Sequence, residues 1–149
     1  ILSMTDKLSL DKSKAVVSGA TGGVGSIGIR LLSQLGADVT AITGKMNKKS
    51  WLKELGASKV LDRKRFIDST NHPLSKGKYD IALDVVGGRI LSSIIACMNY
   101  GGIITTCGNV GGPKLETSVF PFILRGNSLI GIDSAACSIE KKKMILENF

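Results

Sequence analysis

The sequence predicts an α/β domain built on a doubly wound, parallel sheet of six strands, the arrangement known as the Rossmann fold. Short apolar, β-branched runs alternate with helical patterns along the chain, and glycine-rich turns separate them. The apolar residues are mostly Ile, Leu, Val and Ala, and only 5% of the residues are aromatic, which suits buried parallel strands. With 149 residues, we expect residues 1–149 to form a single domain.

The first half of the chain reads strand, helix, strand, helix, strand. A strand over residues 14–18 ends at Gly19, and a helix that Gly36 stops follows the next glycines. This helix carries an amphipathic stripe at helical spacing, formed by Val24, Ile27, Gly28, Leu31, Leu32 and Leu35. Beyond it we expect a strand over 38–43, a helix over 48–55 and a strand over 59–61.

The second half repeats the alternation after a polar segment, 63–78, which is expected to be a loop with one helical turn. The elements expected after it are strands over 81–86, 103–107 and 129–133 and helices over 90–98 and 138–149. Ser138 is the expected N-cap of the last helix.

Charge is concentrated in one stretch of the chain. The formal net charge is +8, and residues 45–65 hold eight Lys or Arg against two acidic residues, which gives 8 − 2 = +6. The stretch is either a solvated basic face or a site for a phosphorylated ligand. We expect no nucleic-acid partner, because the stretch lacks the interleaved aromatic side chains on which bases stack.

Cysteine usage and hydropathy indicate a cytoplasmic protein without a metal or a membrane span. The three cysteines are widely spaced and have only His72 as a possible nitrogen partner, so neither zinc binding nor a disulfide framework is expected. His72 precedes a proline in a polar segment, where a solvated side chain is the expectation. No apolar run approaches the roughly 20 residues of a membrane span, and no signal peptide is recognisable.

The most informative motif is the glycine loop that follows the first strand. Gly19, Gly22 and Gly25 are spaced by three residues, with Gly23 as an extra glycine. Such a loop turns tightly off a strand and lets a pyrophosphate approach the backbone amides that open the next helix. A glycine-rich turn without a ligand is the alternative. The position between a strand and an amphipathic helix favours a dinucleotide.

The end of the second strand predicts which dinucleotide is bound. An NAD-preferring site places a carboxylate there to accept hydrogen bonds from the ribose 2′-hydroxyl. This sequence has Thr43, Gly44 and Lys45 instead, and a hydroxyl, an amide and an ammonium group favour a 2′-phosphate. NADP(H) is therefore the expected cofactor.

Other nucleotide-binding and catalytic classes are disfavoured. A P-loop would need Gly-Lys-Ser/Thr where Gly25 is followed by Ser26 and Ile27. A short-chain dehydrogenase would need Tyr-x-x-x-Lys, and Leu83 and Ile104 stand four residues after the two tyrosines. A methyltransferase would need an acidic residue near the end of the second strand.

Several motifs together resemble one enzyme family, namely residues 19–25 (GATGGVG), 43–45 (TGK), 55–58 (LGAS), 98–102 (MNYGG) and 121–125 (PFILR). In order and spacing they are similar to the YhdH-type quinone oxidoreductases and acrylyl-CoA reductases, within the zinc-free medium-chain dehydrogenase/reductase superfamily. The resemblance covers residues 11–149, and the block 120–134 is its most specific part. It implies an NADPH-dependent enzyme that delivers hydride to a quinone or to an activated alkene such as an enoyl thioester.

The resemblance also implies roles for individual residues. The pyrophosphate would be held by Thr21, Gly22, Gly23 and Val24. The 2′-phosphate would be surrounded by Thr43, Gly44, Lys45 and Lys59. The nicotinamide end would be lined by Asn109, Ile123 and Ser134, although Ile123 also fits a core position and Ser134 a strand-end cap. Asp84 and Cys107 are expected to be buried core residues, and no catalytic residue is assigned.

Members of that family carry a second, GroES-like domain that forms the far wall of the active site. We therefore expect this chain to be a cofactor domain excised from a longer, two-domain enzyme, and to be inactive alone. A self-contained module that senses NADP(H) without turnover is the alternative. The sixth strand would be an open sheet edge, which suggests a homodimer.

Overall fold

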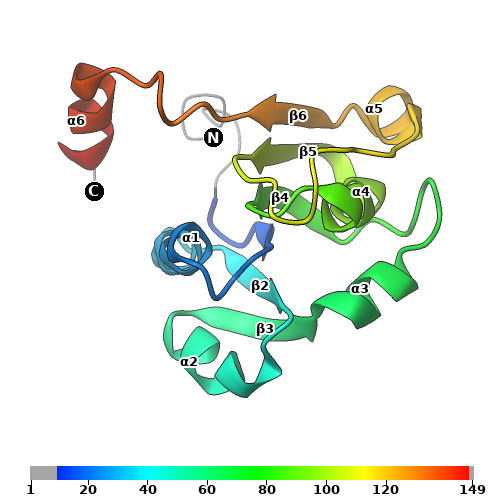
Figure 1. Cartoon of the computed structure of the whole chain (residues 1–149), viewed down its shortest axis with the longest axis horizontal. Helices are drawn as coiled ribbons and strands as arrows, with labels where there is room; N and C mark the ends of the chain where they lie inside the picture. Colours follow the sequence, from blue (N-terminus) through cyan, green and yellow to red (C-terminus); the bar gives the residue numbers. More distant parts are fainter. Residues whose placement is uncertain (1–9, 148–149) are drawn as a thin grey trace.

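Six parallel strands form the centre of the molecule, in the order β3-β2-β1-β4-β5-β6 (Figure 1). The computed structural model describes residues 10–147. The order starts in the middle of the sheet and winds outward in both directions from β1 and β4, which confirms the doubly wound prediction. The strands are β1 (Lys14–Val17), β2 (Asp38–Thr43), β3 (Ala57–Asp62), β4 (Tyr79–Asp84), β5 (Met98–Thr106) and β6 (Ser128–Gly131).

Helices cover both faces of this sheet (Figure 1). The helices of the described residues are α1 (Gly23–Gln34), η2 (Met46–Lys48, a 3₁₀ helix), α2 (Lys49–Glu54), α3 (Arg63–Ser69), α4 (Gly88–Ala96), α5 (Phe120–Arg125) and α6 (Ile139–Glu147), of which α6 stands apart from the sheet in Figure 1. Ile29 and Leu32 of α1 and Leu52 of α2 belong to one buried cluster. Phe66 of α3 and the apolar face of α4 belong to the other. Each face of the central strands therefore has its own hydrophobic core.

The polar segment after β3 contains more helix than the sequence indicates. We expected one helical turn in residues 63–78, but α3 runs from Arg63 to Ser69. Asp62 caps this helix, because its carboxylate accepts a 3.0 Å hydrogen bond from the amide of Arg65. Phe66 is its one buried residue. The helix therefore lacks the repeating apolar stripe from which a helix is predicted in a sequence.

The expected boundary between α4 and β5 was also wrong. The helix ends at Ala96, and Met98 already belongs to β5, whereas we expected the helix to reach residue 98 and the strand to start at 103. A glycine with φ +71°, Gly101, lies inside this strand and makes its first half look like a turn in the sequence. At the other end of the chain, Ser138 is confirmed as the N-cap of α6, since its hydroxyl accepts a hydrogen bond from the amide of Lys141 (3.2 Å). The last two residues of the expected helix, 148 and 149, lie outside the described residues.

The face of α1 that meets the sheet differs from the stripe read from the sequence. Of the six stripe residues only Leu32 is buried, and the side chains of Val24 and Ile27 are 56% and 62% exposed. Gly25 and Ile29 are buried instead. The reason is steric: the glycines of α1 bring the helix so close to the loop and to β4 that the glycine face, not the larger apolar stripe, turns inward.

Candidate functional site

The glycine loop connects β1 to α1 at the carboxyl end of the sheet. Gly19 has φ +58°, a left-handed conformation that favours glycine, and the amide of Gly22 returns a 2.9 Å hydrogen bond to its carbonyl. A Cβ on Gly25 would overlap the carbonyl oxygen of Gly19, whereas a Cβ on Gly23 would meet no atom within 4 Å. The loop therefore packs tightly on its inner side and leaves its outer side open.

The first turn of α1 faces this open side. Gly22 is its N-cap, and no side chain caps the helix or places a carboxylate in the first turn. Thr21 is half-buried, and Gly22, Gly23 and Val24 are exposed. Free amides at a helix start, next to a backbone that admits close approach, form a favourable environment for an anion.

A buried carboxylate stabilises the base of the loop. Asp84, the last residue of β4, is fully buried, as the sequence predicted. It accepts hydrogen bonds from the hydroxyls of Ser18 (2.6 Å) and Thr106 (2.9 Å) and from the amides of Gly87 (2.9 Å) and Val86 (3.3 Å). The carboxylate of Asp84 thus connects the ends of β1, β4 and β5 through hydrogen bonds to both of its oxygens.

The end of β2 presents the residues expected to contact a phosphorylated ribose. Thr43 is buried, and its hydroxyl accepts a 3.0 Å hydrogen bond from the amide of Lys45. Gly44 and the Lys45 side chain are exposed beside it. Lys59 is exposed on β3 in register with Thr40, while Asp62 is the residue that pairs with Thr43. At about 3.3 Å per residue, the Cα of Lys59 lies roughly 10 Å below the strand ends.

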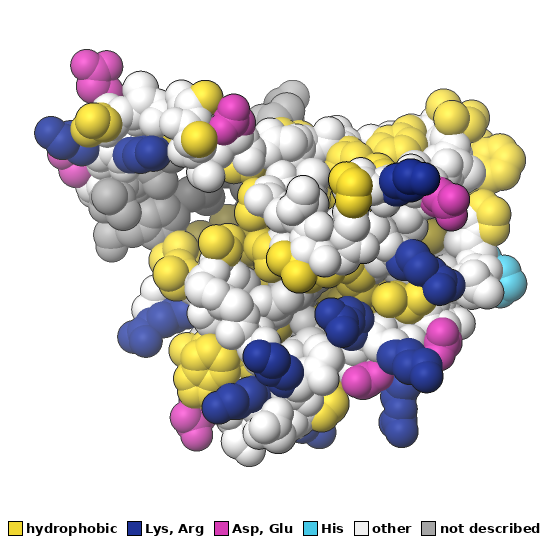
Figure 2. All heavy atoms as spheres, in the orientation of Figure 1, with side chains coloured by type: hydrophobic (Ala, Val, Ile, Leu, Met, Phe, Trp, Pro, Cys, Tyr) yellow, Lys and Arg dark blue, Asp and Glu magenta, His cyan; other side chains and the backbone are white. Residues whose placement is uncertain are grey.

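The guanidinium of Arg63 lies against Gly44, a contact that the sequence analysis did not assign. A Cβ on Gly44 would lie 3.1 Å from an Nη atom and 3.3 Å from Cζ of Arg63. The basic stretch contained this arginine, but only the pairing of β2 with β3 shows which of its cations reaches Gly44. All eight Lys and Arg side chains of the stretch are exposed, and Figure 2 shows such side chains gathered around α2, β3 and α3.

The three residues expected at the nicotinamide end do not lie together. Asn109 lines an open groove at the carboxyl ends of β5 and β6, and Asp133, which also lines this groove, directly precedes Ser134. Ile123 belongs to α5 and is 69% exposed. Two residues further on, Arg125 donates to the carbonyl of Met98, the first residue of β5, so Ile123 lies near the opposite end of the sheet.

Cys107 is exposed, which corrects the expectation of a core residue. It follows the last residue of β5 and lines the same open groove as Asn109, beyond the reach of the covering helices. Partial burial, together with the nearby carboxylate of Asp84, raises the pKa of its thiol. Cys97 is the fully buried cysteine, and His72 is exposed, as expected.

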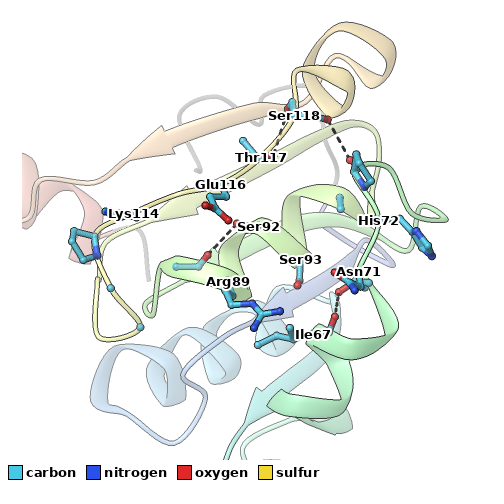
Figure 3. Close-up of a pocket in the computed structure, with 17 residues that line it drawn as sticks. Ile67, Asn71, His72, Arg89, Ser92, Ser93, Lys114, Glu116, Thr117 and Ser118 are labelled. Carbon is cyan, nitrogen blue, oxygen red and sulfur yellow. Dashed lines mark hydrogen bonds between the residues drawn. The ribbon is translucent and has the colours of Figure 1, made fainter.

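A separate cavity of about 760 Å³ lies between α3, α4 and the segment that leads to α5 (Figure 3). Hydroxyl groups from Thr70, Ser92, Ser93 and Thr117 line it, and Figure 3 shows Arg89 between α4 and Ile67 of α3. No residue assigned to the cofactor from the sequence lines this cavity. In an open α/β sheet, ligands bind outside the carboxyl ends of the strands, so the glycine loop rather than this cavity is the candidate cofactor site.

Neither a metal centre nor a membrane span is visible in residues 10–147. Over this part of the chain, no three His, Cys, Asp or Glu side chains come together in a way that could hold a metal ion. No helix within the same residues is long and apolar enough to cross a bilayer.

Similar structures exist for this chain. It superposes with a TM-score of 0.90 on the Bacillus subtilis protein YhfP solved with NAD bound, at 41% identity, over 97% of this chain and 44% of that one. Escherichia coli YhdH solved with NADPH gives a TM-score of 0.86 at 42% identity, over 91% of this chain and 42% of that one.

Comparison of sequences leads to the same group. The chain is 46% identical over 127 residues to the probable acrylyl-CoA reductase AcuI of Escherichia coli, which covers 85% of this chain and 39% of that protein. This chain thus spans about two fifths of the length of these relatives.

Residues 23–147 match the family described as "Zinc-binding dehydrogenase". The name refers to zinc, but the donor side chains described above do not gather into a zinc site, and nothing below depends on a metal. The chain belongs to this zinc-binding dehydrogenase family, within the medium-chain dehydrogenase/reductase superfamily.

Proposed function

We propose that this domain binds NADP(H) for a zinc-independent oxidoreductase that reduces an activated alkene, such as an enoyl thioester, or a quinone. The observation that carries the proposal is the start of α1, which no side chain caps, beside a loop that is open at Gly23, where a diphosphate would approach the backbone. In this proposal Thr21, Gly22, Gly23 and Val24 contact the pyrophosphate. The bound cofactor supplies the hydride, and the chain's residues hold and orient it.

The choice of NADP(H) rests on the end of β2. The YhfP structure carries NAD and the YhdH structure carries NADPH, so the relatives' ligands include both dinucleotides. Thr43, Gly44 and Lys45 provide no carboxylate for a ribose 2′-hydroxyl, and an exposed ammonium group favours the 2′-phosphate. Lys59 is a further proposed contact, and its side chain would extend from β3 toward the carboxyl ends of the strands.

The nicotinamide end is proposed to lie over the groove at the ends of β5 and β6. Asn109 and Ser134 are the proposed contacts there. The loop that carries Asn109 follows Thr106, whose hydroxyl donates a hydrogen bond to Asp84. The assignment of Ile123 to this end rests on family resemblance alone, because its position on α5 does not bring it near Asn109. A second, GroES-like domain would complete the site, and the small-molecule substrate would bind between the two domains.

We further propose that two copies associate through β6 in the cytoplasm. β6 is the last strand of the sheet, and α5 beside it exposes Phe120, Ile123 and Leu124. The opposite edge, β3, carries the exposed charge of Lys59, which discourages strand pairing. Ile123→Glu should therefore reduce a dimer to a monomer in analytical ultracentrifugation, while Lys59→Glu should leave its mass unchanged.

Calorimetric titration of the chain with NADPH and NADH tests the cofactor proposal. We expect NADPH to bind at least about tenfold more tightly, a difference of roughly 1.4 kcal/mol. Equal affinities, or no binding of either dinucleotide, would overturn it. A non-catalytic NADP(H)-sensing module is the less favoured alternative, since the relative that is 46% identical is named as a probable acrylyl-CoA reductase. Turnover of an enoyl thioester by the full-length protein separates the two.

A further inference from the structure

The side chain of Arg63 lies face-on against the backbone of Gly44. A Cβ built on Gly44 would be 3.1 Å from an Nη atom of Arg63, 3.3 Å from Cζ and 3.6 Å from Nε. Three atoms of one planar group at nearly equal distances from one point indicate that the plane of the guanidinium, not its edge, faces Gly44. A side chain at position 44 would meet this plane, so the contact depends on the glycine.

The fold brings these two residues together from 19 positions apart. Thr43 pairs with Asp62 at the ends of β2 and β3, so the next residue of each strand, Gly44 and Arg63, leaves the sheet at the same place. Asp62 caps α3 by accepting a hydrogen bond from the amide of Arg65, which fixes the direction of the helix that starts at Arg63. The guanidinium is therefore positioned by the sheet register and the helix cap.

The charge of Arg63 is left uncompensated in the part of the chain that the structure describes. Its side chain is exposed, and no carboxylate within residues 10–147 forms an ion pair with it. The neighbouring Asp62 uses one of its carboxylate oxygens for the helix cap. Lys45, the residue after Gly44, is a second exposed cation. The end of β2 thus has one cation packed against Gly44 and a second that follows it in the chain.

We propose that Arg63 is a specificity-determining residue that binds the 2′-phosphate of NADP(H), an inference that rests on the proposed function above. The guanidinium has several N–H donors in one plane and can contact two phosphate oxygens at once, whereas Lys45 offers a point charge. With its plane against Gly44, its edge with the N–H groups is free to face a ligand at the end of β2. The ribose would lie between the glycine loop and this edge.

The test measures NADPH and NADH affinity by calorimetry for the parent chain, Arg63→Met and the matched control Lys64→Met. Lys64 is the next residue of α3 and is also exposed. Arg63→Met should weaken NADPH binding by about tenfold or more, because a hydrogen-bonded charge is lost, and change NADH binding by less than about twofold. Lys64→Met should leave both affinities near those of the parent. Thermal unfolding midpoints verify that each variant folds.

Gly44→Ala provides a second, independent test. The added methyl group would push the guanidinium aside by a few tenths of an ångström or more, since the far end of a flexible side chain gives way first. We expect weaker NADPH binding in Gly44→Ala, and no further selective loss of NADPH when it is added to Arg63→Met. Independent, additive effects of the two substitutions would overturn the proposed coupling.

The outcomes separate this inference from the proposed function. If the parent chain prefers NADPH and Arg63→Met keeps the full preference, or if Lys64→Met loses as much as Arg63→Met, the role of Arg63 is wrong and NADP(H) binding stands. If the parent chain binds the two dinucleotides equally or binds neither, the proposed function itself is wrong.

Discussion

The hydroxyl of Ser18 donates a 2.6 Å hydrogen bond to the carboxylate of Asp84, and both side chains are fully buried. Ser18 directly precedes the glycine loop, and Asp84 directly precedes the turn into α4. The same hydroxyl accepts a 3.1 Å hydrogen bond from the amide of Val85. One pair of side chains therefore joins the carboxyl ends of β1 and β4. The base of the candidate site is therefore a hydrogen-bond network rather than an apolar contact.

Asp84→Ala should destabilise the domain strongly. It removes the acceptor of two hydroxyls and two amides, and each buried donor left without a partner costs about 1 to 3 kcal/mol. We expect the free energy of unfolding in urea to fall by about 3 kcal/mol or more, and by about 1 kcal/mol for Thr106→Val, which removes one donor. A loss below about 1 kcal/mol for Asp84→Ala would contradict this account.

Gly25→Ala should disturb the loop, whereas Gly23→Ala should not. The first Cβ overlaps the carbonyl oxygen of Gly19, and that backbone atom cannot move without opening the loop, while the second lies in open space. Overpacking costs about 1 to 3 kcal/mol, so the thermal midpoint of Gly25→Ala should fall well below that of Gly23→Ala. Equal midpoints would show that the loop is looser than its contacts indicate.

Cys97 should make the domain less stable in alkaline solution. Burial raises the pKa of its thiol to about 12 in the folded state, from 9.0 as the ordinary value. Above pH 9 the unfolded chain loses this proton and the folded chain keeps it. The free energy of unfolding therefore falls by about 1.4 kcal/mol per pH unit between the two pKa values. Urea titrations at pH 8.5 and 10.5 should show a smaller difference for Cys97→Ala.

Lys45→Glu should abolish the preference for NADPH. Its carboxylate would repel a 2′-phosphate and would accept hydrogen bonds from a ribose 2′-hydroxyl, so the roughly tenfold difference between the two affinities should disappear. Lys53→Glu, an equally exposed change on α2, is the control for net charge. The same loss of preference in both variants would mean that overall charge, not the end of β2, selects the cofactor.

Arg125→Met should release α5 from the sheet. Its guanidinium donates to the carbonyls of Ala96 (3.0 Å), Met98 (2.9 Å) and Ser75. Loss of this charged donor should lower the free energy of unfolding by about 2 to 3 kcal/mol. Arg125→Lys should recover only part of it, because an ammonium group cannot span all three carbonyls. Protection of the β6 amides from hydrogen exchange should fall in parallel.

Local patterns predicted most of the strands and the main glycine loop. The expected strand over 38–43 is β2, and the expected strand over 14–18 is one residue longer than β1. The buried role of Asp84 was also predicted, from its place inside the apolar run 81–86. Each of these depends on residues close together in the chain.

Long-range packing decided the remainder. The sequence could not show that Gly25, rather than Val24 and Ile27, turns inward, because that depends on how closely α1 approaches Gly19. Periodicity did not reveal α3, since Phe66 is its single buried residue.

The sequence by itself determined the class of fold, the loop that can admit a diphosphate and the absence of a carboxylate at the end of β2, because these follow from local backbone preference and residue chemistry. Only the tertiary structure decided which cation of the basic stretch lies against Gly44. That choice depends on the pairing of Thr43 with Asp62 across two strands, and strand register is fixed by packing over the whole sheet.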